Sequence, residues 1–318
     1  MMANTIEYAK IFQPELDAAA VEQATSGWME VNRDLVRYSG GDEVKIPNVV
    51  MDGLADYDRA NGFVAGSVDL SWQTMKMTKD RGRSFQIDEN DVDESGFVLA
   101  AASLMGEFQR VHVVPEIDAY RYSTIAQKCM GADLAAYSYT PAESSILKAL
   151  LDDIAAVQDV VGENTPLIVS ISTLVLNLLN NSDKLSRRLD VTDFSQGDVT
   201  VKVKSLNGIP LRSVPSGRMK SKYVFQDGKT AGQEKGGFKA AEDAIDINWL
   251  ITPQNAPIAV SKTDKMRIFD PDTNQKARAW GWDYRRYHDL WITKEKLKTC
   301  RANFKQAKPA AVEPEETA

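Results

Sequence analysis

His288 and Asp289, next to Arg285 and Arg286, are the residues whose types and spacing best suit acid/base chemistry. A carboxylate beside an imidazole can orient the ring and raise its pKa, as a general base requires. However, residues 279–293 are dense in aromatic side chains and predict strands, and adjacent residues on a strand point to opposite faces. The sequence therefore favours a packed, structural histidine, with a soluble α/β enzyme that uses this pair as the alternative.

Other motifs that carry chemistry are absent from the sequence. It contains no glycine-rich phosphate loop, no nucleophile elbow and no zinc-protease helix motif. The soft ligands Cys129, Cys300, His112 and His288 are too widely spaced for a local zinc cluster. An acidic run lacks the glycine of a calcium loop, so helix capping and solvation are favoured there; it comprises Asp88, Glu89, Asp91, Asp93 and Glu94. We therefore expect no catalytic residue, no cofactor and no metal.

Length and composition describe an ordinary globular protein. The chain has 318 residues, of which 43% are hydrophobic and 26% charged, and this excludes a disordered chain, a collagen and a coiled-coil rod. At roughly 150 residues per domain, a chain of this length is expected to form about two domains. The net charge of -7 is unsuited to wrapping duplex nucleic acid, which requires a cationic face. The basic cluster of Arg212, Arg218, Lys220 and Lys222 therefore indicates an intersubunit salt-bridge site or a solvated face, with equal weight.

The compartment follows from the ends of the chain and the cysteines. The first residues lack the basic and apolar regions of a signal peptide, and no apolar run reaches the roughly 18 residues that span a bilayer. Two distant cysteines do not form a disulfide framework. We therefore expect synthesis in a reducing cytoplasm, without a membrane partner.

Residues 42–90 predict a long two-stranded ribbon. Apolar residues alternate with polar ones along it, at Val44, Ile46, Val68, Leu70, Trp72, Met75, Met77, Phe85 and Ile87. A slip of phase between Trp72 and Met75 predicts a bulge, and Asp80-Arg81-Gly82 predicts a turn or a second bulge. Such a ribbon is marginal alone in water, so it must pack on its own body or on another chain.

The remaining elements alternate between helices and strands. A helix over 91–112 presents one apolar face, made of Phe97, Ala101, Leu104, Phe108 and Val111. A second helix follows over 115–131, and a capping box at Thr140–Glu143 opens a third that ends near Gly162. Pro166 precedes a continuous apolar run over 167–171 that predicts a buried strand. Thr173 caps a short helix, and Asn207-Gly208 joins two strands as a hairpin. A short helix over 14–25, a mobile surface loop over 226–241 and strands after 247 complete an α+β pattern.

This order of segments resembles the major capsid protein of tailed bacteriophages, with the Hong Kong 97-type fold. The resemblance rests on EVKIPNVVMDGLADYDRANGF and VDLSWQTMKMTKDRGRSFQID, on the acidic helix start DENDVDESG, on APIAVSKTDKMRIFDP and on YRRYHDLWI, and it covers about residues 40–306. It implies an N-terminal arm over 1–41, an extended loop (E-loop) over 42–90 and a flexible acidic tail over 307–318. Between them it implies a peripheral (P) domain over 91–139 and 257–306, with a long spine helix over 91–112. An α/β axial (A) domain over 140–256 would be inserted into the P domain.

The resemblance also implies a function. The chain would be the structural subunit of an icosahedral virion that self-assembles into hexamers and pentamers, joins a portal protein, leaves room for a decoration protein and encloses double-stranded DNA without sequence-specific binding. Because only about 41 residues precede the ribbon, the scaffold would be a separate protein. The E-loop would contact neighbouring subunits through Val68, Leu70, Trp72, Met75, Met77, Arg81 and Arg83, and the hairpin of the A domain would present Arg212, Arg218 and Lys220.

Two alternatives stay open at this point. An encapsulin, a cellular nanocompartment with the same fold, would differ in its gene neighbours, which would include a cargo enzyme in place of terminase and portal genes. The soluble enzyme that uses His288, Asp289 and Arg286 would instead be a monomer or small oligomer with a deep pocket. Size-exclusion chromatography separates this enzyme from a megadalton shell.

We predict that residues 309–318 are dispensable for assembly. They combine two prolines with three glutamates and almost no apolar surface, so they cannot bury themselves against the shell. A chain that lacks them should give the same yield of particles by negative-stain electron microscopy as the full chain. Absence of particles would refute this prediction.

Overall fold

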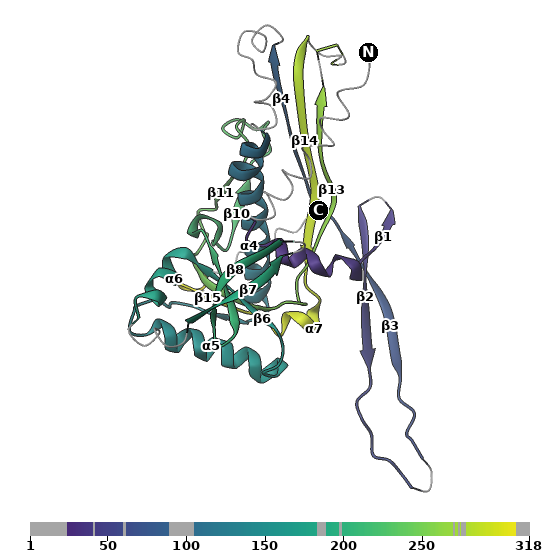
Figure 1. Ribbon diagram of the computed structural model, residues 1–318. Helices are drawn as coiled ribbons and strands as arrows, with labels where there is room; N and C mark the ends of the chain where they lie inside the picture. The colour runs from purple at the N-terminus through teal and green to yellow at the C-terminus, as the bar shows by residue number, and fades with distance from the viewer. Residues whose placement is uncertain are drawn as a thin grey trace.

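The computed structural model describes residues 24–309 apart from 41, 60–61, 89–104, 183–188, 197–198, 270, 273 and 275–277. The helix expected over 14–25, the tail after 309 and most of the apolar stripe expected over 91–112 therefore lie outside the described residues. Within them, helices and strands form three groups that are visible in Figure 1: a sheet covered by helices, a long narrow sheet, and a ribbon that extends away from both.

The largest sheet has seven strands in the order β5-β15-β12-β6-β9-β8-β7. Its strands are β5 (Ala135–Ala136), β6 (Leu167–Ser172), β7 (Leu189–Gln196), β8 (Val199–Leu206), β9 (Ile209–Val214), β12 (Ile247–Pro253) and β15 (Arg301–Phe304). Every residue of β6 and β12 is buried, because helices pack on both faces. Trp249 and Ile251 contact helices α5 (Ile146–Val161) and α6 (Thr173–Asn180), whereas Leu250 packs in the cluster of α4 (Val114–Gly131). The buried run at 167–171 is thus confirmed as a central strand.

The last strand crosses the domain boundary that we expected at residue 256. β13 (Ile258–Phe269) and β14 (Ala279–Trp291) do form a separate sheet, but β15 pairs with β12 inside the seven-stranded sheet. A short helix, α7 (Lys294–Leu297), lies between β14 and β15. Residues 301–304 therefore share a sheet with residues that we assigned to the axial domain, because backbone pairing with β12 is the contact that buries them.

The long narrow sheet has three strands in the order β13-β14-β4, where β4 is Lys79–Asp88. The register between β4 and β14 is unbroken from Asp88 opposite Ala279 to Lys79 opposite His288. The turn or bulge predicted at Asp80-Arg81-Gly82 is therefore wrong. Glycine is present at 82 because the neighbouring strand approaches so closely that a Cβ atom would lie 2.8 Å from the Tyr284 carbonyl oxygen.

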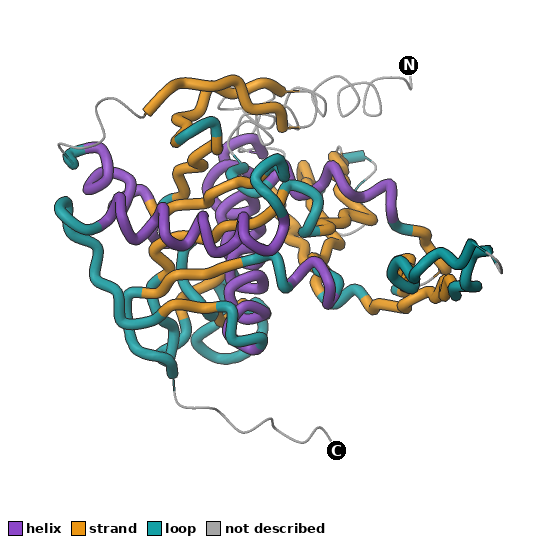
Figure 2. Tube along the Cα trace, turned by 90° about the horizontal axis from the view of Figure 1, so that it is seen from below, coloured by secondary structure: helices purple, strands orange, loops and turns teal. Residues whose placement is uncertain are grey.

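The ribbon is formed by β2 (Glu43–Met51) and β3 (Val68–Lys76), with the short strand β1 (Arg37–Gly40) beside β2. It extends from the rest of the described chain in Figure 1 and stands to one side in Figure 2. Its register is regular from Glu43 opposite Lys76 to Met51 opposite Val68, so the bulge predicted after Trp72 is wrong. The ribbon also ends at Lys76, because β4 leaves it for the long sheet.

The change of phase in the ribbon reflects two faces of one strand. Val44 and Ile46 share a face with Met75, and this face packs with the fully buried Met77 against β13 and β14. Trp72, Leu70 and Val68 lie on the opposite face, because side chains alternate along a strand. An apolar pattern that changes phase therefore marks the point where burial passes from one face of the ribbon to the other.

A single helix replaces the two helices that we expected around residue 113. Residues 105–108 are helical, η2 (Gln109–Val113) is a π-helical turn, and α4 continues without a break to Gly131. Pro115 lies inside this continuous helix, directly after the π-helical turn, and its ring removes one backbone hydrogen-bond donor there. The π-helical turn shifts the helical phase, which explains why Val111, expected on the apolar face, is 43% exposed.

Local signals for turns were confirmed more often than signals for helix starts. Asn207 and Gly208 have positive φ and join β8 to β9, and α5 ends at Gly162, which also has positive φ. However, α5 begins at Ile146 and not at the capping box, because backbone hydrogen bonds from Ser138 and Tyr139 to the end of β15 keep the preceding chain extended.

Two smaller expectations also change. Thr173 is the first residue of α6 and hydrogen-bonds to the Val214 carbonyl, so Ser172 occupies the cap position. Within the expected loop 226–241, Phe238–Ala240 forms the strand β11, which pairs with β10 (Tyr223–Phe225).

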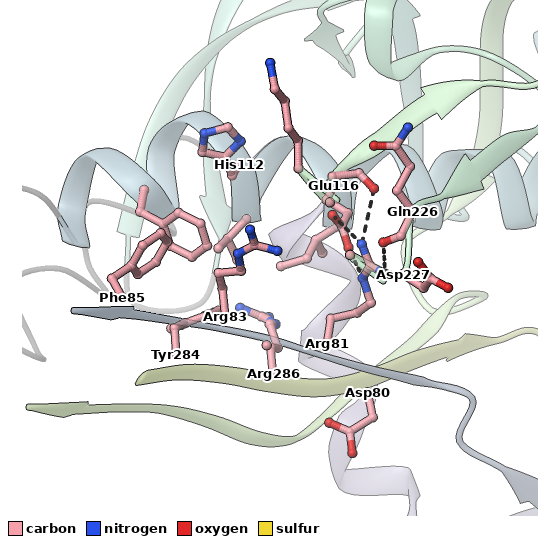
Figure 3. Close-up of a pocket in the computed structure, with 18 of the residues that line it drawn as sticks. Asp80, Arg81, Arg83, Phe85, His112, Glu116, Gln226, Asp227, Tyr284 and Arg286 are labelled. Atoms are coloured by element: carbon pink, nitrogen blue, oxygen red, sulfur yellow. Dashed lines mark hydrogen bonds and ion pairs between the residues drawn. The ribbon is translucent and has the colours of Figure 1, made fainter. Parts of the chain in front are cut away.

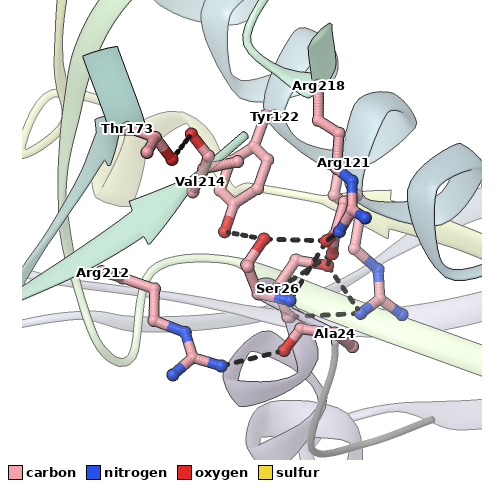
Figure 4. Close-up of polar contacts among 10 residues, drawn as sticks. Ala24, Ser26, Arg121, Tyr122, Thr173, Arg212, Val214 and Arg218 are labelled. Carbon is pink, nitrogen blue, oxygen red and sulfur yellow. Dashed lines mark hydrogen bonds and ion pairs between the residues drawn. The ribbon is translucent and has the colours of Figure 1, made fainter. Parts of the chain in front are cut away.

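A fully buried carboxylate, that of Asp118 in α4, attaches the N-terminal segment to the body. Two of its partners, Ser26 and Arg218, are labelled in Figure 4. The Asp118 carboxylate accepts hydrogen bonds from the backbone N–H and the hydroxyl of both Thr25 and Ser26, at 2.6–3.1 Å. It also forms an ion pair with Arg218, whose Nη1 lies 2.9 Å away. These contacts place the short helix η1 (Gly27–Leu35), whose Trp28 is fully buried, in the core.

A second set of ion pairs extends from this attachment. Arg121 is 1% exposed and binds the Ser26 carbonyl oxygen and, at 2.5 Å, a carboxylate oxygen of Glu30. The same Glu30 oxygen accepts Arg286 Nη2 from β14 at 2.9 Å. The N-terminal segment is therefore bound to both α4 and the long sheet.

We predict that Asp118→Asn strongly destabilises the folded subunit. The amide would present donors to groups that are themselves donors, and removal of one partner of a buried ion pair costs about 3–5 kcal/mol. The measurement is the free energy of unfolding in urea. Asp152→Asn is the matched control, because Asp152 forms an exposed pair with Lys148 on α5 and should change the free energy by only about 0–1 kcal/mol. Equal effects would contradict the role of Asp118.

Candidate functional site

The distal half of the ribbon exposes a continuous set of large apolar side chains. Val68 is 68% exposed, Leu70 59% and Trp72 41%, and the Arg37 guanidinium lies 5.1 Å from the centre of the Trp72 ring. Soluble monomers rarely expose extended apolar patches, so such a surface marks a site of interaction with another molecule. We call this surface, together with the tip residues described next, the ribbon surface.

The tip of the ribbon adds residues that sequence reasoning missed. Five more large apolar side chains are exposed there: Met51, Leu54, Tyr57, Phe63 and Val64. Tyr57 and Phe63 pack edge to face with ring centres 4.9 Å apart, and a backbone bridge joins Asp58 to Gly62. The segment GLADYDRANGF reads as a turn from its glycines and aspartates, and its interspersed apolar residues were the signal for a surface.

The base of the ribbon is rigidly attached to the body. Thr78, where β3 passes into β4, donates both its backbone N–H and its hydroxyl to Asp289 Oδ2, at 2.7 and 3.0 Å. Tyr120 of α4 donates its hydroxyl to Asp289 Oδ1 at 2.5 Å. The buried carboxylate of Asp289 thus fixes the point from which the ribbon leaves the body.

Four of the residues expected at intersubunit contacts of the ribbon are used inside the chain. Met77 is buried, and Met75 packs against the same cluster. Arg81 forms a bidentate ion pair with Glu116 of α4, at 2.7 and 3.2 Å. Arg83 is exposed, and it donates to the Glu234 carbonyl oxygen at 3.2 Å. Of the ribbon residues expected at intersubunit contacts, Val68, Leu70 and Trp72 are therefore the exposed apolar ones.

The basic cluster near the hairpin likewise makes contacts within the subunit. Arg212 is buried in β9 and donates to the Ala24 carbonyl oxygen, while Arg218 pairs with Asp118 (Figure 4). Lys220 forms an ion pair with Asp246. These side chains contribute to the subunit's own fold.

The structure does not assemble His288 and Asp289 into an acid/base pair. Both side chains are buried, and among the hydrogen bonds of the described residues none joins them. The Asp289 oxygens are occupied by Thr78, Tyr120 and the Leu290 N–H. Burial, together with the neighbouring cations Arg286, Arg121, Lys79 and Arg81, holds the pKa of His288 well below its ordinary value of 6.5. The expectation of a packed histidine agrees with this geometry.

The described residues hold no cluster of three or more histidine, cysteine, aspartate or glutamate side chains that could bind a metal ion. Cys129 and Cys300 are both buried and free, and burial raises the pKa of the Cys300 thiol to about 12. Among the same residues, no helix is both long and apolar enough to cross a bilayer.

Comparison with known proteins identifies the fold. No protein-family model and no curated protein matches the sequence. Among solved structures, the mature capsid of bacteriophage PhiM1 is 14% identical, with a TM-score of 0.55 over 84% of this chain and 82% of that one. The capsid of cyanophage P-SCSP1u is 12% identical, with a TM-score of 0.53 over 84% of each chain. A structure from Gordonia phage Cozz is 13% identical, with a TM-score of 0.51 over 86% of each.

These matches cover most of the chain and of its counterparts. The chain therefore has the mixed α/β fold of phage capsid proteins, and the resemblance seen in the sequence is confirmed at the level of the fold.

We predict that His288 makes stability depend on pH while contributing little to function. Because its pKa is depressed in the folded chain, the unfolded chain binds a proton that the folded chain lacks at pH values below about 6.5. The free energy of unfolding should therefore fall with decreasing pH, at up to about 1.4 kcal/mol per pH unit.

His288→Ala should remove this component, at a packing cost of about 1–3 kcal/mol at neutral pH. His112→Ala is the matched control, because His112 is exposed. Urea unfolding at several pH values tests the prediction, and an unchanged pH dependence in His288→Ala would contradict it. Loss of a turnover activity with the fold intact would instead revive an enzymatic role for His288.

Proposed function

We propose that this chain is the major capsid protein of a tailed bacteriophage, a non-enzymatic structural subunit of the icosahedral virion. The observation that carries the proposal is the ribbon surface: a two-stranded ribbon, attached rigidly at its base, exposes large apolar side chains that the described chain leaves uncovered. The fold, shared with solved phage capsids, supports the same conclusion.

The ribbon acts as the extended loop that lies over a neighbouring subunit. A strand pair that cannot form a core of its own gains stability only when a second surface covers it. In a closed shell every ribbon has the same neighbour, so each copy covers one ribbon and is covered by another. This arrangement makes the stability of the subunit depend on assembly by mass action.

The other parts then take their places around this contact. The long sheet with the helix 105–131 forms the peripheral domain, and the helix-covered sheet forms most of the axial domain, which meets its copies at the centres of hexamers and pentamers. The net charge of -7 suits a wall that confines double-stranded DNA without adhering to it. A separate scaffold protein directs assembly, and one vertex receives the portal.

Internal packing of the polar residues supports a structural role over the enzymatic alternative. His288 and Asp289, the best acid/base candidates, are both buried. His288 packs against the Tyr120 ring, and Asp289 accepts the hydrogen bonds at the base of the ribbon. General acid/base catalysis would need the two side chains to act together on one substrate, whereas the Asp289 oxygens are occupied by other donors.

We predict that Trp72→Ala impairs assembly much more than it destabilises the subunit. The Trp72 side chain is already 41% exposed, whereas an aromatic side chain at an interface buries about 150–250 Å². Truncation of an aromatic in a packed environment costs about 3–5 kcal/mol, and every subunit of the shell would lose the same contact. Thermal unfolding of the free subunit and the particle yield form the paired measurement.

Trp291→Ala provides the contrast, because Trp291 is buried where the ribbon meets the body and its loss should lower the melting temperature of the subunit itself. If Trp72→Ala instead melts many degrees lower with normal particle yield, the ribbon packs on its own chain and the proposed overlap is wrong.

A further inference from the structure

A cavity of about 460 Å³ lies between the β4–β14 sheet, the helix 105–131 and the loop 226–237 (Figure 3). It is separate from the ribbon surface. Its walls combine an aromatic end, with Phe85, Phe108 and Tyr284, and a cationic end that includes Arg83 and Arg286. The volume falls within the range of small-ligand sites.

The cations come from one face of two paired strands. Arg81 and Arg83 alternate along β4, and Arg286 lies directly opposite Arg81 on β14. Alternation therefore places three guanidinium groups on the cavity side of the sheet, and Lys229 and Lys235 of the loop line the same space. Figure 3 shows the Arg83 and Arg286 side chains directed into the space between the sheet and the helix.

The acidic residues of this region are already occupied. Glu116 is bound by Arg81, and Arg286 pairs outside the cavity with Glu30, which it shares with Arg121. The Asp227 carboxylate accepts the Thr230 hydroxyl and the N–H groups of Lys229 and Thr230 within its own loop, and these hydrogen bonds lower its pKa to about 2. Asp80 points away from the cavity in Figure 3 and pairs with Arg285 on the opposite face.

Among the described residues, the Arg83 guanidinium has no carboxylate partner. In the described chain its guanidinium donates only to the Glu234 carbonyl oxygen, and no carboxylate lies within ion-pair distance of it. The backbone of Gly228 approaches Arg83 so closely that a Cβ atom there would lie 3.0 Å from Nη1. The side chain is thus held against the loop with most of its planar donor fork unused.

A buried histidine supplies the second observation. His288 lines the same cavity, is only 3% exposed, and its Nδ1 has no hydrogen-bond partner among the described residues. Buried polar atoms are rarely left unpaired. An unused arginine fork and an unpaired imidazole nitrogen thus border one cavity.

We propose that this cavity binds an oxyanion, a phosphate or carboxylate group, with Arg83 as its principal ligand and His288 as a further donor. The planar fork of arginine matches the paired oxygens of these groups. Lys229 and Lys235 add positive charge to the cavity wall, and the aromatic end accommodates the uncharged part of a larger anion. This inference rests on the geometry of the cavity and not on the capsid assignment.

The experiment is a titration of the full-length chain with inorganic phosphate and, separately, with sodium acetate, at constant ionic strength, by isothermal calorimetry. We expect saturable binding. Arg83→Gln should weaken it at least about tenfold, because it removes charge-assisted hydrogen bonds. Arg285→Gln is the matched control: it removes the same charge from the next strand of the same sheet, but its side chain pairs with Asp80 on the other face, so affinity should not change.

The two titrations also identify the source of the oxyanion. Tighter binding of phosphate supports a phosphate group as the ligand, whereas equal or tighter binding of acetate supports an acidic side chain. Absence of saturable binding by either anion would overturn the proposal. Equal weakening by Arg83→Gln and Arg285→Gln would also overturn it, because only general surface charge would then be responsible.

Discussion

The burial of the Asp118 carboxylate is the constraint on which the arrangement of this subunit depends. A carboxylate removed from water is tolerated only when its oxygens are fully hydrogen-bonded. Here the donors come from Thr25 and Ser26 at the start of the described chain and from Arg218 beyond the hairpin. Two segments that are remote from α4 in sequence must therefore meet on it at the same time, and the N-terminal segment becomes part of the core.

A second buried carboxylate, that of Asp289, fixes the position of the ribbon. Tyr120, two residues after Asp118 on α4, donates to Asp289, which in turn binds Thr78 at the start of β4. The base of the ribbon is thus coupled to the helix through one tyrosine and one aspartate. A subunit with a rigid base and an uncovered apolar ribbon is folded as a body but incomplete as a surface, which is the condition that favours assembly.

The long sheet shows how a shared fold persists at 12–14% identity to solved phage capsids. A strand of this sheet requires side chains that alternate between the two faces, room for the neighbouring strand to approach, and charged side chains with partners of opposite sign. Many different sequences meet these requirements. In this chain Gly82 permits the close approach of β4 to β14, and Arg81 with Glu116 attaches the sheet to the helix. The same alternation of side chains along β4 places Arg83 beside the cavity, where no described carboxylate pairs with it. The pattern that builds the sheet therefore also supplies a cation that can bind an anion.

Local interactions are what the sequence determined by itself. Alternation identified the ribbon, a continuous apolar run identified the central strand at 167–171, and turn residues identified the hairpin at Asn207-Gly208 and the end of α5 at Gly162. Each of these signals depends on neighbouring residues or on a positive φ. Tertiary contacts decided the rest. Hydrogen bonds from Ser138 and Tyr139 to the end of β15 hold the chain before α5, so that this helix begins at Ile146 and not at the capping box. Pairing with β14 made Asp80-Arg81-Gly82 part of a strand, since the close approach that requires a glycine there exists only when two distant segments meet.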